Sequence, residues 1–282
     1  MTGKRLRRIF FFVLFIALLL YVVTGAVRSL YLESTLISLS LPSPNDVTAT
    51  VRIVQVSDLH RAVFGEQNQD LVDLIASKSP DIIVATGDMV DIRAKDIEDC
   101  VSLMKRLVKI APVFYSLGNH EVERDDLDQL VHALRGVGVC FLNNSAAEIT
   151  VHGIPLRIGG LYHAELLRAM EQEDKVDILL CHFPEKLAVY SDYGVPLTFS
   201  GHTHGGQFRI PIAHIAIYAP GQGLFPKYTA GLYEDGGSYM IVSRGLGNSS
   251  FPFRVHNPPE IVVADVTYTP KDDLQYRAAR PR

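Results

Sequence analysis

Cysteine is scarce in this chain of 282 residues, and its pattern argues against a cysteine-based metal site. Cys100, Cys140 and Cys181 have no Cys-x-x-Cys spacing, and three cysteines cannot all pair with one another. We expect buried thiols at these positions. Because Cys181 and His182 alternate along a predicted strand, we expect their side chains to lie on opposite faces of it.

Beyond the first eight residues the chain also lacks any long run of Lys and Arg, and its formal net charge is −4. It therefore has no electrostatic footprint for nucleic acid, and we expect no nucleic-acid partner. Repeats, low-complexity segments and internal linkers are absent too. We expect residues 1–45 to form an anchor and linker, 46–270 one domain, and 271–282 a polar tail.

Charge is also missing from the 19 residues Ile9 to Val27, which as a helix would be about 28 Å long. That length nearly matches one bilayer core, so we expect an uncleaved, single-pass anchor in the inner or cytoplasmic membrane. The four basic residues Lys4, Arg5, Arg7 and Arg8 precede the run, and the positive-inside rule then places the rest of the chain outside. A substrate made in the cytoplasm would require the opposite orientation, so the sequence does not decide which membrane face carries the domain.

A cleaved signal peptide is the alternative interpretation of this segment. Thr24-Gly25-Ala26 resembles a small-residue cleavage site, and Arg7-Arg8 resembles part of a twin-arginine signal. The apolar run is long for a signal peptide, which favours the anchor.

Five polar blocks follow five apolar runs that are typical of buried strands. The runs are residues 52–56, 81–86, 113–117, 177–180 and 197–199. The carboxyl ends of such strands are where open α/β sheets place their sites. The blocks are, in chain order, Asp58-Leu59-His60, Gly87-Asp88, Gly118-Asn119-His120-Glu121, Cys181-His182 and Gly201-His202-Thr203-His204.

Carboxylate, imidazole and amide oxygen form a mixed donor set that suits manganese, iron, cobalt or zinc better than magnesium or calcium. The number of donors is enough for two divalent ions, which at roughly 3.5–4 Å apart can clamp a phosphoryl group. One carboxylate must then bridge the ions, and Asp88 is the residue that we expect to do so.

Taken together, the five blocks resemble the signature of the calcineurin-like metallophosphoesterase superfamily. The resemblance covers roughly residues 53–263 and implies two divalent ions, for which we favour manganese. It assigns one ion to Asp58, His60, Asp88 and His204, and the other to Asp88, Asn119, His182 and His202.

The resemblance further leaves His120 free of metal, to contact the phosphate and to protonate or stabilise the leaving oxygen. We expect Asp91 and Glu121 to orient His120 or a metal ligand from behind.

Later motifs are similar to those of a bacterial branch of membrane-bound or exported phosphoesterases, which includes enzymes that hydrolyse UDP-2,3-diacylglucosamine in lipid A synthesis. These motifs are residues 201–207, 242–247, 252–254 and 258–260. They imply a hydrolase for a phosphodiester or pyrophosphate, with a lipid-linked substrate preferred. The alternatives are a broad-specificity phosphodiesterase or phosphatase and a non-catalytic metal-binding scaffold. Arg244 and Arg254 could bind a second anionic group or could be structural ion-pair partners.

Helical periodicity is present in three segments, around residues 71–75, 97–108 and 127–134. Strands alternate with them up to about Leu142 and dominate from Leu156 onward. This order fits the family's α/β fold, a two-sheet β-sandwich flanked by helices.

The stretch from Gly205 to Gly237 is rich in glycine, proline and apolar residues and follows two predicted ligands. It could cover the site, form an acyl-chain groove or rest on the bilayer, and a simple packed hairpin and loop is equally compatible with its composition.

Overall fold

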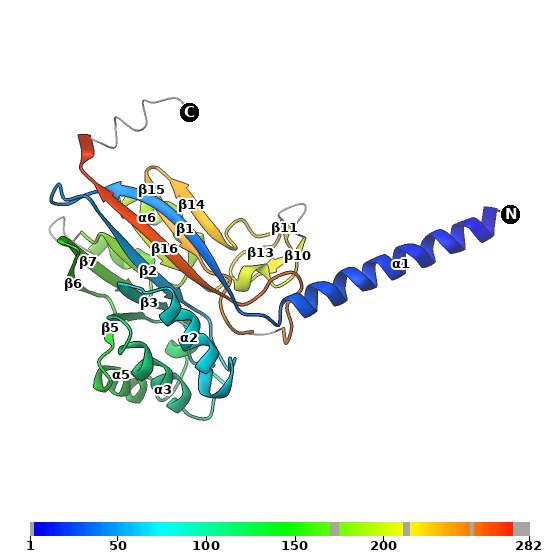
Figure 1. The fold of residues 1–282 in the computed structure, drawn as a ribbon, viewed down its shortest axis with the longest axis horizontal. Helices are drawn as coiled ribbons and strands as arrows, with labels where there is room; N and C mark the ends of the chain where they lie inside the picture. Colours follow the sequence, from blue (N-terminus) through cyan, green and yellow to red (C-terminus); the bar gives the residue numbers. More distant parts are fainter. Residues whose placement is uncertain (1–2, 170–174, 211–214, 249–250, 273–282) are drawn as a thin grey trace.

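Two six-stranded sheets packed face to face make up most of the protein (Figure 1). The computed structural model describes residues 3–169, 175–210, 215–248 and 251–272. The first sheet has the order β1-β16-β2-β3-β4-β5, with β1 Glu33–Pro42, β16 Glu260–Thr269, β2 Ala49–Val56, β3 Ile82–Thr86, β4 Val113–Ser116 and β5 Cys140–Leu142. The second has the order β14-β15-β9-β8-β7-β6, with β14 Gly231–Asp235, β15 Ser238–Val242, β9 Leu197–Ser200, β8 Ile178–Cys181, β7 Ile154–Leu161 and β6 Ser145–Val151.

Most of the inner strands are parallel, and their apolar runs are buried on both faces. β2, β3, β4 and β5 pair in parallel in the first sheet, as do β7, β8, β9 and β15 in the second. Ile53, Val84, Phe199 and Ile241 belong to the core between the sheets and are fully buried. Strands buried on both faces need continuous apolar sequence, which is why the five predicted runs are nearly uninterrupted.

Helices cover the outer faces of the sandwich. α2 (Gln69–Ser77), α3 (Glu98–Leu107) and α5 (Leu127–Gly136) lie on the first sheet, and α6 (Leu187–Asp192) lies on the second (Figure 1). The three predicted helical stripes supply buried residues such as Leu71, Met104 and Leu130 to the first of these outer cores. The predicted fold class is therefore confirmed.

The structure differs from the expected domain boundary at β1. Residues 33–42, which we expected in a linker, pair in parallel with β16 from Glu33↔Glu260 to Pro42↔Thr269. Ile37, Leu39 and Leu41 alternate with Ser38 and Ser40, a pattern of period two that is typical of a strand. The longer apolar run at residues 9–27 is the stronger sequence signal and masks this alternation. Of the predicted polar tail, residues 273–282 lie outside the described residues.

The apolar run of the N-terminus lies in one long helix, α1 (Gly3–Arg28), which extends away from the sandwich (Figure 1). Its most apolar window has a mean hydropathy of 2.7, and only 6% of that window is buried, so the helix is long and apolar enough to cross a membrane. Its C-terminal turns contact the domain beside two small strand pairs, β10 (Arg209–Ile210) with β11 (Ile215–Ala216) and β12 (Tyr218–Ala219) with β13 (Gly223–Leu224).

Candidate metal centre

The five polar blocks meet at one edge of the sandwich, where strands of both sheets end. Three blocks follow β2, β3 and β4 of the first sheet, and two follow β8 and β9 of the second. Gln55 joins the two sheets just below them, because its Nε2 donates to Thr86 Oγ1 and to the carbonyl oxygen of Ser200, each at 2.8 Å. Residues that lie up to 146 positions apart in the sequence thus become neighbours.

One group of predicted ligands consists of Asp58, His60 and His204, whose ligand atoms lie within 4.8 Å of one another. The Nε2 atoms of His60 and His204 are 3.3 Å apart, and His204 Nε2 is 3.7 Å from Asp58 Oδ1. All three residues are buried. Carboxylate and imidazole donors that converge at this spacing could share one divalent ion.

A second group consists of Asp88, His182 and His202. Asp88 Oδ2 lies 3.3 Å from His182 Nε2 and 3.9 Å from His60 Nε2, so this carboxylate faces both groups. That position is the one expected of a bridging ligand. Asn119 begins α4 (Asn119–Val122) beside them, and its buried Oδ1 has no hydrogen-bond partner among the described residues.

The tautomers of two histidines leave lone pairs aimed into the centre. His182 Nδ1 lies 2.7 Å from the carbonyl oxygen of Thr86 and donates its proton there, and His204 Nδ1 similarly faces the carbonyl oxygen of Gly247 at 3.3 Å. In the neutral rings, their Nε2 atoms are then acceptors. His182 Nε2, although close to Asp88, finds no hydrogen bond of suitable geometry within the described ranges. With His182 neutral, its Nε2 lone pair and the Asp88 carboxylate could share a cation, and the residues fit a divalent metal.

The pKa values of the same groups reflect this crowding. Burial lowers the pKa of His60 to about 4 and that of His202 to about 3, so both rings are neutral at pH 7, the form that binds metal. Burial also raises the pKa of Asp58 to about 6. The pKa of His182, by contrast, rises to about 10 against the effect of burial, because Asp88 attracts positive charge to its Nε2. A metal ion would replace that proton.

His120 lies beside the centre with a defined tautomer. Its Nδ1 accepts the backbone N–H of Ile92 at 3.1 Å, so a neutral His120 ring carries its proton on Nε2. Nε2 is 3.9 Å from Asp88 Oδ2, and the ring centroid is 4.4 Å from that of His60. The side chain is 12% exposed, unlike the fully buried His60 and His182 side chains, so it can reach a bound substrate.

Glu121 holds the loop that carries Asp88 rather than the His120 side chain. Its buried carboxylate accepts the backbone N–H groups of Asp88, Met89 and Gly118 at 2.8, 2.6 and 2.9 Å, and the Tyr115 hydroxyl at 2.7 Å. Burial, and then the charge of Asp88, raise the pKa of Glu121. Asp91 Oδ2 lies 3.7 Å from His60 Nδ1 and 3.9 Å from His120 Nδ1, so it faces both rings from behind.

The backbone at the centre is strained. Asp58, His60, Asp88, His202 and His204 all have positive φ angles, between 48° and 70°, which non-glycine residues rarely adopt. A Cβ at Gly118 would overlap Asp88 Oδ1, so this position requires glycine. Strained residues of this kind gather at sites where the geometry of side chains matters for function.

Arg244 and Arg254 bind oxygen atoms of the chain itself. Arg244 Nη2 donates to Glu260 Oε2 at 2.6 Å. Arg254 is buried and donates to the carbonyl oxygens of Arg244 and Gly247 and to Asn248 Oδ1. These contacts fit the structural role that the sequence left open as the alternative to substrate binding.

Sequence reasoning missed Asn257. Its Nδ2 donates to the carbonyl oxygen of His204 at 2.7 Å, and its own N–H donates to Ser29 Oγ at 3.0 Å, just beyond α1. His204, a predicted metal ligand, is thereby linked through Asn257 to the end of the N-terminal helix. No periodicity or motif marks such a residue, because its role depends on where two distant loops meet.

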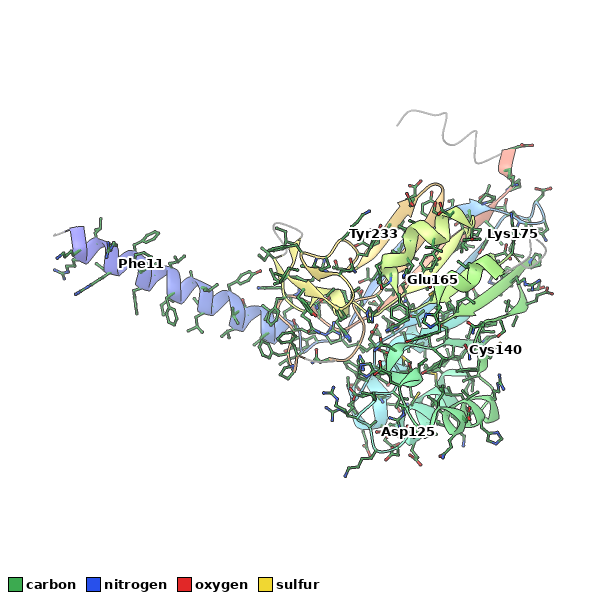
Figure 2. The ribbon with its side chains drawn as sticks, turned by 180° about the vertical axis from the view of Figure 1, so that it is seen from behind. Phe11, Asp125, Cys140, Glu165, Lys175 and Tyr233 are labelled. Atoms are coloured by element: carbon green, nitrogen blue, oxygen red, sulfur yellow. The ribbon has the colours of Figure 1, made fainter. Side chains whose placement is uncertain are left out.

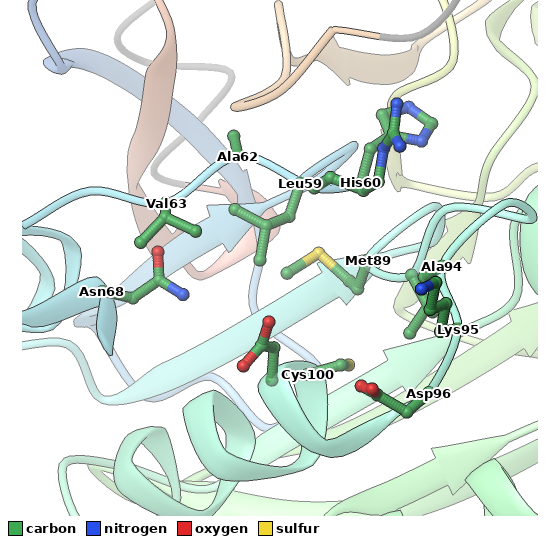
Figure 3. A pocket seen from close by; sticks show the side chains of 13 residues that line it. Leu59, His60, Ala62, Val63, Asn68, Met89, Ala94, Lys95, Asp96 and Cys100 are labelled. Atoms are coloured by element: carbon green, nitrogen blue, oxygen red, sulfur yellow. The ribbon is translucent and has the colours of Figure 1, made fainter. Parts of the chain in front are cut away.

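A cavity of about 220 Å³ opens beside the centre (Figure 3). Leu59, Met89 and Cys100 form its floor, and Lys95 and Asp96 lie at the loop on its rim. Of the seven predicted ligands, His60 lines this cavity. The cavity is therefore next to the metal centre and separate from the group formed by Asp88, His182 and His202.

Comparison with known proteins agrees with the geometry. Residues 51–206 match the family model described as calcineurin-like phosphoesterase. An uncharacterized metallophosphoesterase of Aquifex aeolicus is 31% identical over 229 residues, which cover 77% of this chain and 85% of that protein. The phosphodiesterase YaeI of Escherichia coli is 27% identical, over 78% of this chain and 84% of its own length.

A vertebrate protein is similar as well. The zebrafish transmembrane protein with metallophosphoesterase domain is 26% identical over 75% of this chain and 52% of its own length. The family match spans all five blocks, and the family uses divalent metals of the kind that the Asp and His groups could hold. The chain therefore belongs to the calcineurin-like phosphoesterase family and is a metal-dependent phosphoester hydrolase.

Proposed function

We propose that this protein hydrolyses a phosphodiester or pyrophosphate bond of a membrane-associated substrate, with UDP-2,3-diacylglucosamine as the specific candidate. The observation that carries the proposal is the hydrogen-bonded path from α1 to the metal centre. Ser29, one residue beyond α1, accepts the N–H of Asn257, which in turn binds the carbonyl oxygen of His204. A helix that crosses the bilayer would thus hold the site close to the membrane surface.

The names of two relatives support the two parts of the proposal, phosphodiester hydrolysis and membrane association, separately. The E. coli relative is named a phosphodiesterase, and the zebrafish relative a transmembrane protein. The apolar α1, used as an uncleaved anchor through residues 9–27, supplies the membrane half for this chain.

The roles that we propose for individual residues follow from their geometry. Asp58, His60 and His204 would hold one divalent ion and Asn119, His182 and His202 the other, with Asp88 as a ligand that both could share. When bound, the ions supply Lewis-acid polarisation of the phosphoryl group and a source of hydroxide at neutral pH. Manganese is our preferred metal.

His120 is proposed to stabilise the leaving oxygen. The backbone N–H of Ile92 occupies Nδ1, so the N–H at Nε2 is available to donate a hydrogen bond to that oxygen, while Glu121 and Asp91 keep the surrounding loops in place. For a pyrophosphate, the leaving group would be a nucleoside monophosphate or a lipid phosphate.

The test is release of UMP from UDP-2,3-diacylglucosamine by the full-length protein in detergent with manganese. We expect release with the parent protein and none with Asp88→Ala. Release that persists in Asp88→Ala would contradict the proposed centre.

A broad-specificity phosphodiesterase is the second candidate, and the plain name of the E. coli relative favours it. Hydrolysis of a generic soluble diester without release of UMP would select this candidate and reject the lipid substrate. Hydrolysis of neither compound, by protein shown to contain metal, would favour a non-catalytic scaffold.

A further inference from the structure

A group of exposed apolar side chains lies where α1 meets the domain (Figure 1). We call it the apolar collar, and its members, all between 38% and 76% exposed, are Leu30, Tyr31, Ile210, Ile215, Tyr218, Leu224, Phe225, Phe251 and Phe253. Leu224 and Phe225 are each 68% exposed. Single exposed apolar residues are ordinary, but a group gathered at one place marks an interaction surface.

Several contacts make the collar continuous with α1. Phe208 packs edge-on against Phe251 and Phe253, with ring centroids 5.8 and 5.6 Å apart, and it pairs with Val255. The main chain at His256 donates to the carbonyl oxygen of Gly25 in the helix. β10, β11 and β13 therefore lie beside the base of α1 (Figure 1).

The domain also contacts α1 well inside its apolar run. The Tyr21 hydroxyl donates to the carbonyl oxygen of Arg209 in β10 at 2.9 Å, and His256 Nε2 lies 3.0 Å from the carbonyl oxygen of Tyr21. Tyr21 precedes the end of that run, Val27, by six residues, or about 9 Å of helix. If α1 spans the bilayer, this part of the domain must enter the boundary between headgroups and acyl chains, which extends over roughly 5–10 Å. Further along the helix, Phe11 projects away from the domain (Figure 2).

The hairpin formed by β12 and β13, which carries Leu224 of the apolar collar, also approaches the metal centre. A Cβ at Gly221, in the turn between β12 and β13, would lie 3.5 Å from His202 Nε2. Phe225 follows Gly221 by four residues, so their Cα atoms are at most about 14 Å apart. One short hairpin therefore separates the exposed Phe225 from a predicted metal ligand.

We infer that the apolar collar is a bilayer-docking surface, which inserts Leu224 and Phe225 into the lipid interface and holds the metal centre beside the lipid headgroups. The substrate class that fits this placement is a phosphoester or pyrophosphate in a lipid headgroup, which would reach the ions without leaving the bilayer. This inference rests on the proposed function for its substrate and on α1 as the membrane anchor. Of the roles left open for residues 205–237, it selects the one at the bilayer surface; residues 211–214 lie outside the described residues.

The absence of tryptophan from the chain allows a direct test. Full-length Phe225→Trp is reconstituted into phosphatidylcholine bilayers, with and without lipids brominated near the headgroup end of their acyl chains. Tyr193→Trp is the matched control, because Tyr193 is also exposed, at 36%, but precedes β9 at the end away from the metal residues. We expect blue-shifted emission and bromine quenching for Phe225→Trp and neither for the control. Equal emission and equal quenching of the two variants would overturn the inference.

A second measurement separates this inference from the proposed function. The variant Leu224→Ser with Phe225→Ser should lose about tenfold in rate on a lipid-linked phosphodiester in bilayers, because two apolar side chains no longer insert. Its rate on a soluble diester should equal that of the parent. If the parent protein cleaves neither substrate while Phe225→Trp is quenched, the proposed function fails and the docking surface stands. If the parent cleaves both and the double variant matches it in bilayers, the docking surface fails and the hydrolase stands.

Discussion

At the scale of single residues, the centre contains buried polar atoms that have no hydrogen-bond partner among the described residues. Asn119 Oδ1 is one, and His182 Nε2, which lies 3.3 Å from Asp88 Oδ2, is another. Buried polar atoms without a partner cost free energy on folding, so they destabilise the centre when no ion is bound. Divalent ions bound there would give such atoms a partner.

His120 offers a test of the chemistry at this scale. His120→Asn should lower kcat on a soluble diester by roughly 10²–10³-fold, because the hydrogen-bond donor on Nε2 that faces the leaving oxygen is lost. Metal content, measured by mass spectrometry, should be unchanged. His132→Asn, on the exposed side of α5, is the control and should keep the parent rate. A parent-like kcat for His120→Asn would remove this residue from the chemical step.

Asn257 offers a second test, of position rather than chemistry. Asn257→Asp replaces the donor to the carbonyl oxygen of His204 by an acceptor, and we expect metal affinity to fall by about tenfold, as for other groups that support metal ligands. Equilibrium dialysis against manganese measures this change. Asn45→Asp is the matched control, since it loses a similar bond, to the carbonyl oxygen of Gly153, beyond the opposite end of β1. Equal affinities for the two variants would contradict the role of Asn257.

At the scale of elements, β1 connects α1 with the catalytic domain. It lies at the edge of the first sheet, yet Leu39 and Leu41 are buried in the core between the sheets. Glu33 and Thr35 at its start lie near Arg244 and Glu260, which support the loop after β15. The strand is thus part of the catalytic domain.

Truncation should separate the contribution of β1 to stability from that of α1. A chain that begins at Arg28 keeps β1 and Ser29 and should unfold at nearly the temperature of the full-length protein in detergent. A chain that begins at Ser43 loses two buried leucines and should be less stable by about 3 kcal/mol or more, at about 1.5 kcal/mol or more for each side chain. Thermal unfolding by circular dichroism measures both. Equal stability of the two truncated chains would show that β1 contributes little to the fold.

At the scale of the whole molecule, the two sheets carry separate parts of one centre. Asp58, Asp88 and Asn119 come from loops of the first sheet, whereas His182, His202 and His204 come from loops of the second. Ions bound between them would hold the sheets together at this edge, so metal binding and global stability are linked.

Metal removal tests this linkage. Chelation should lower the unfolding temperature, and manganese at 100 times its dissociation constant should restore about 2.7 kcal/mol per site. Protons compete for His182, whose pKa is raised to about 10 by Asp88, so the stabilisation by metal should increase as the pH rises from 6 to 9. Calorimetry at several pH values measures both effects. Asp88→Ala should abolish most of the response, and a full response in that variant would contradict a shared centre.

The sequence by itself determined the reaction class and most of the architecture. Each metal-site block directly follows an apolar run, and the local pattern is enough to predict a buried strand with polar residues at its carboxyl end. The helical stripes around Leu71, Met104 and Leu130 are local in the same way. These signals depend on neighbours within a few residues, so they can be read from one chain.

Only the tertiary structure decided which distant residues support the centre. Glu121 holds the Asp88 loop, Asn257 joins His204 to the end of α1, and Arg254 is buried among backbone carbonyl oxygens rather than directed at an anion. The apolar collar likewise combines side chains from before β1 with others from residues 210–253. Such contacts arise because the packing of two sheets brings separate loops together, and no local periodicity in the sequence encodes that meeting.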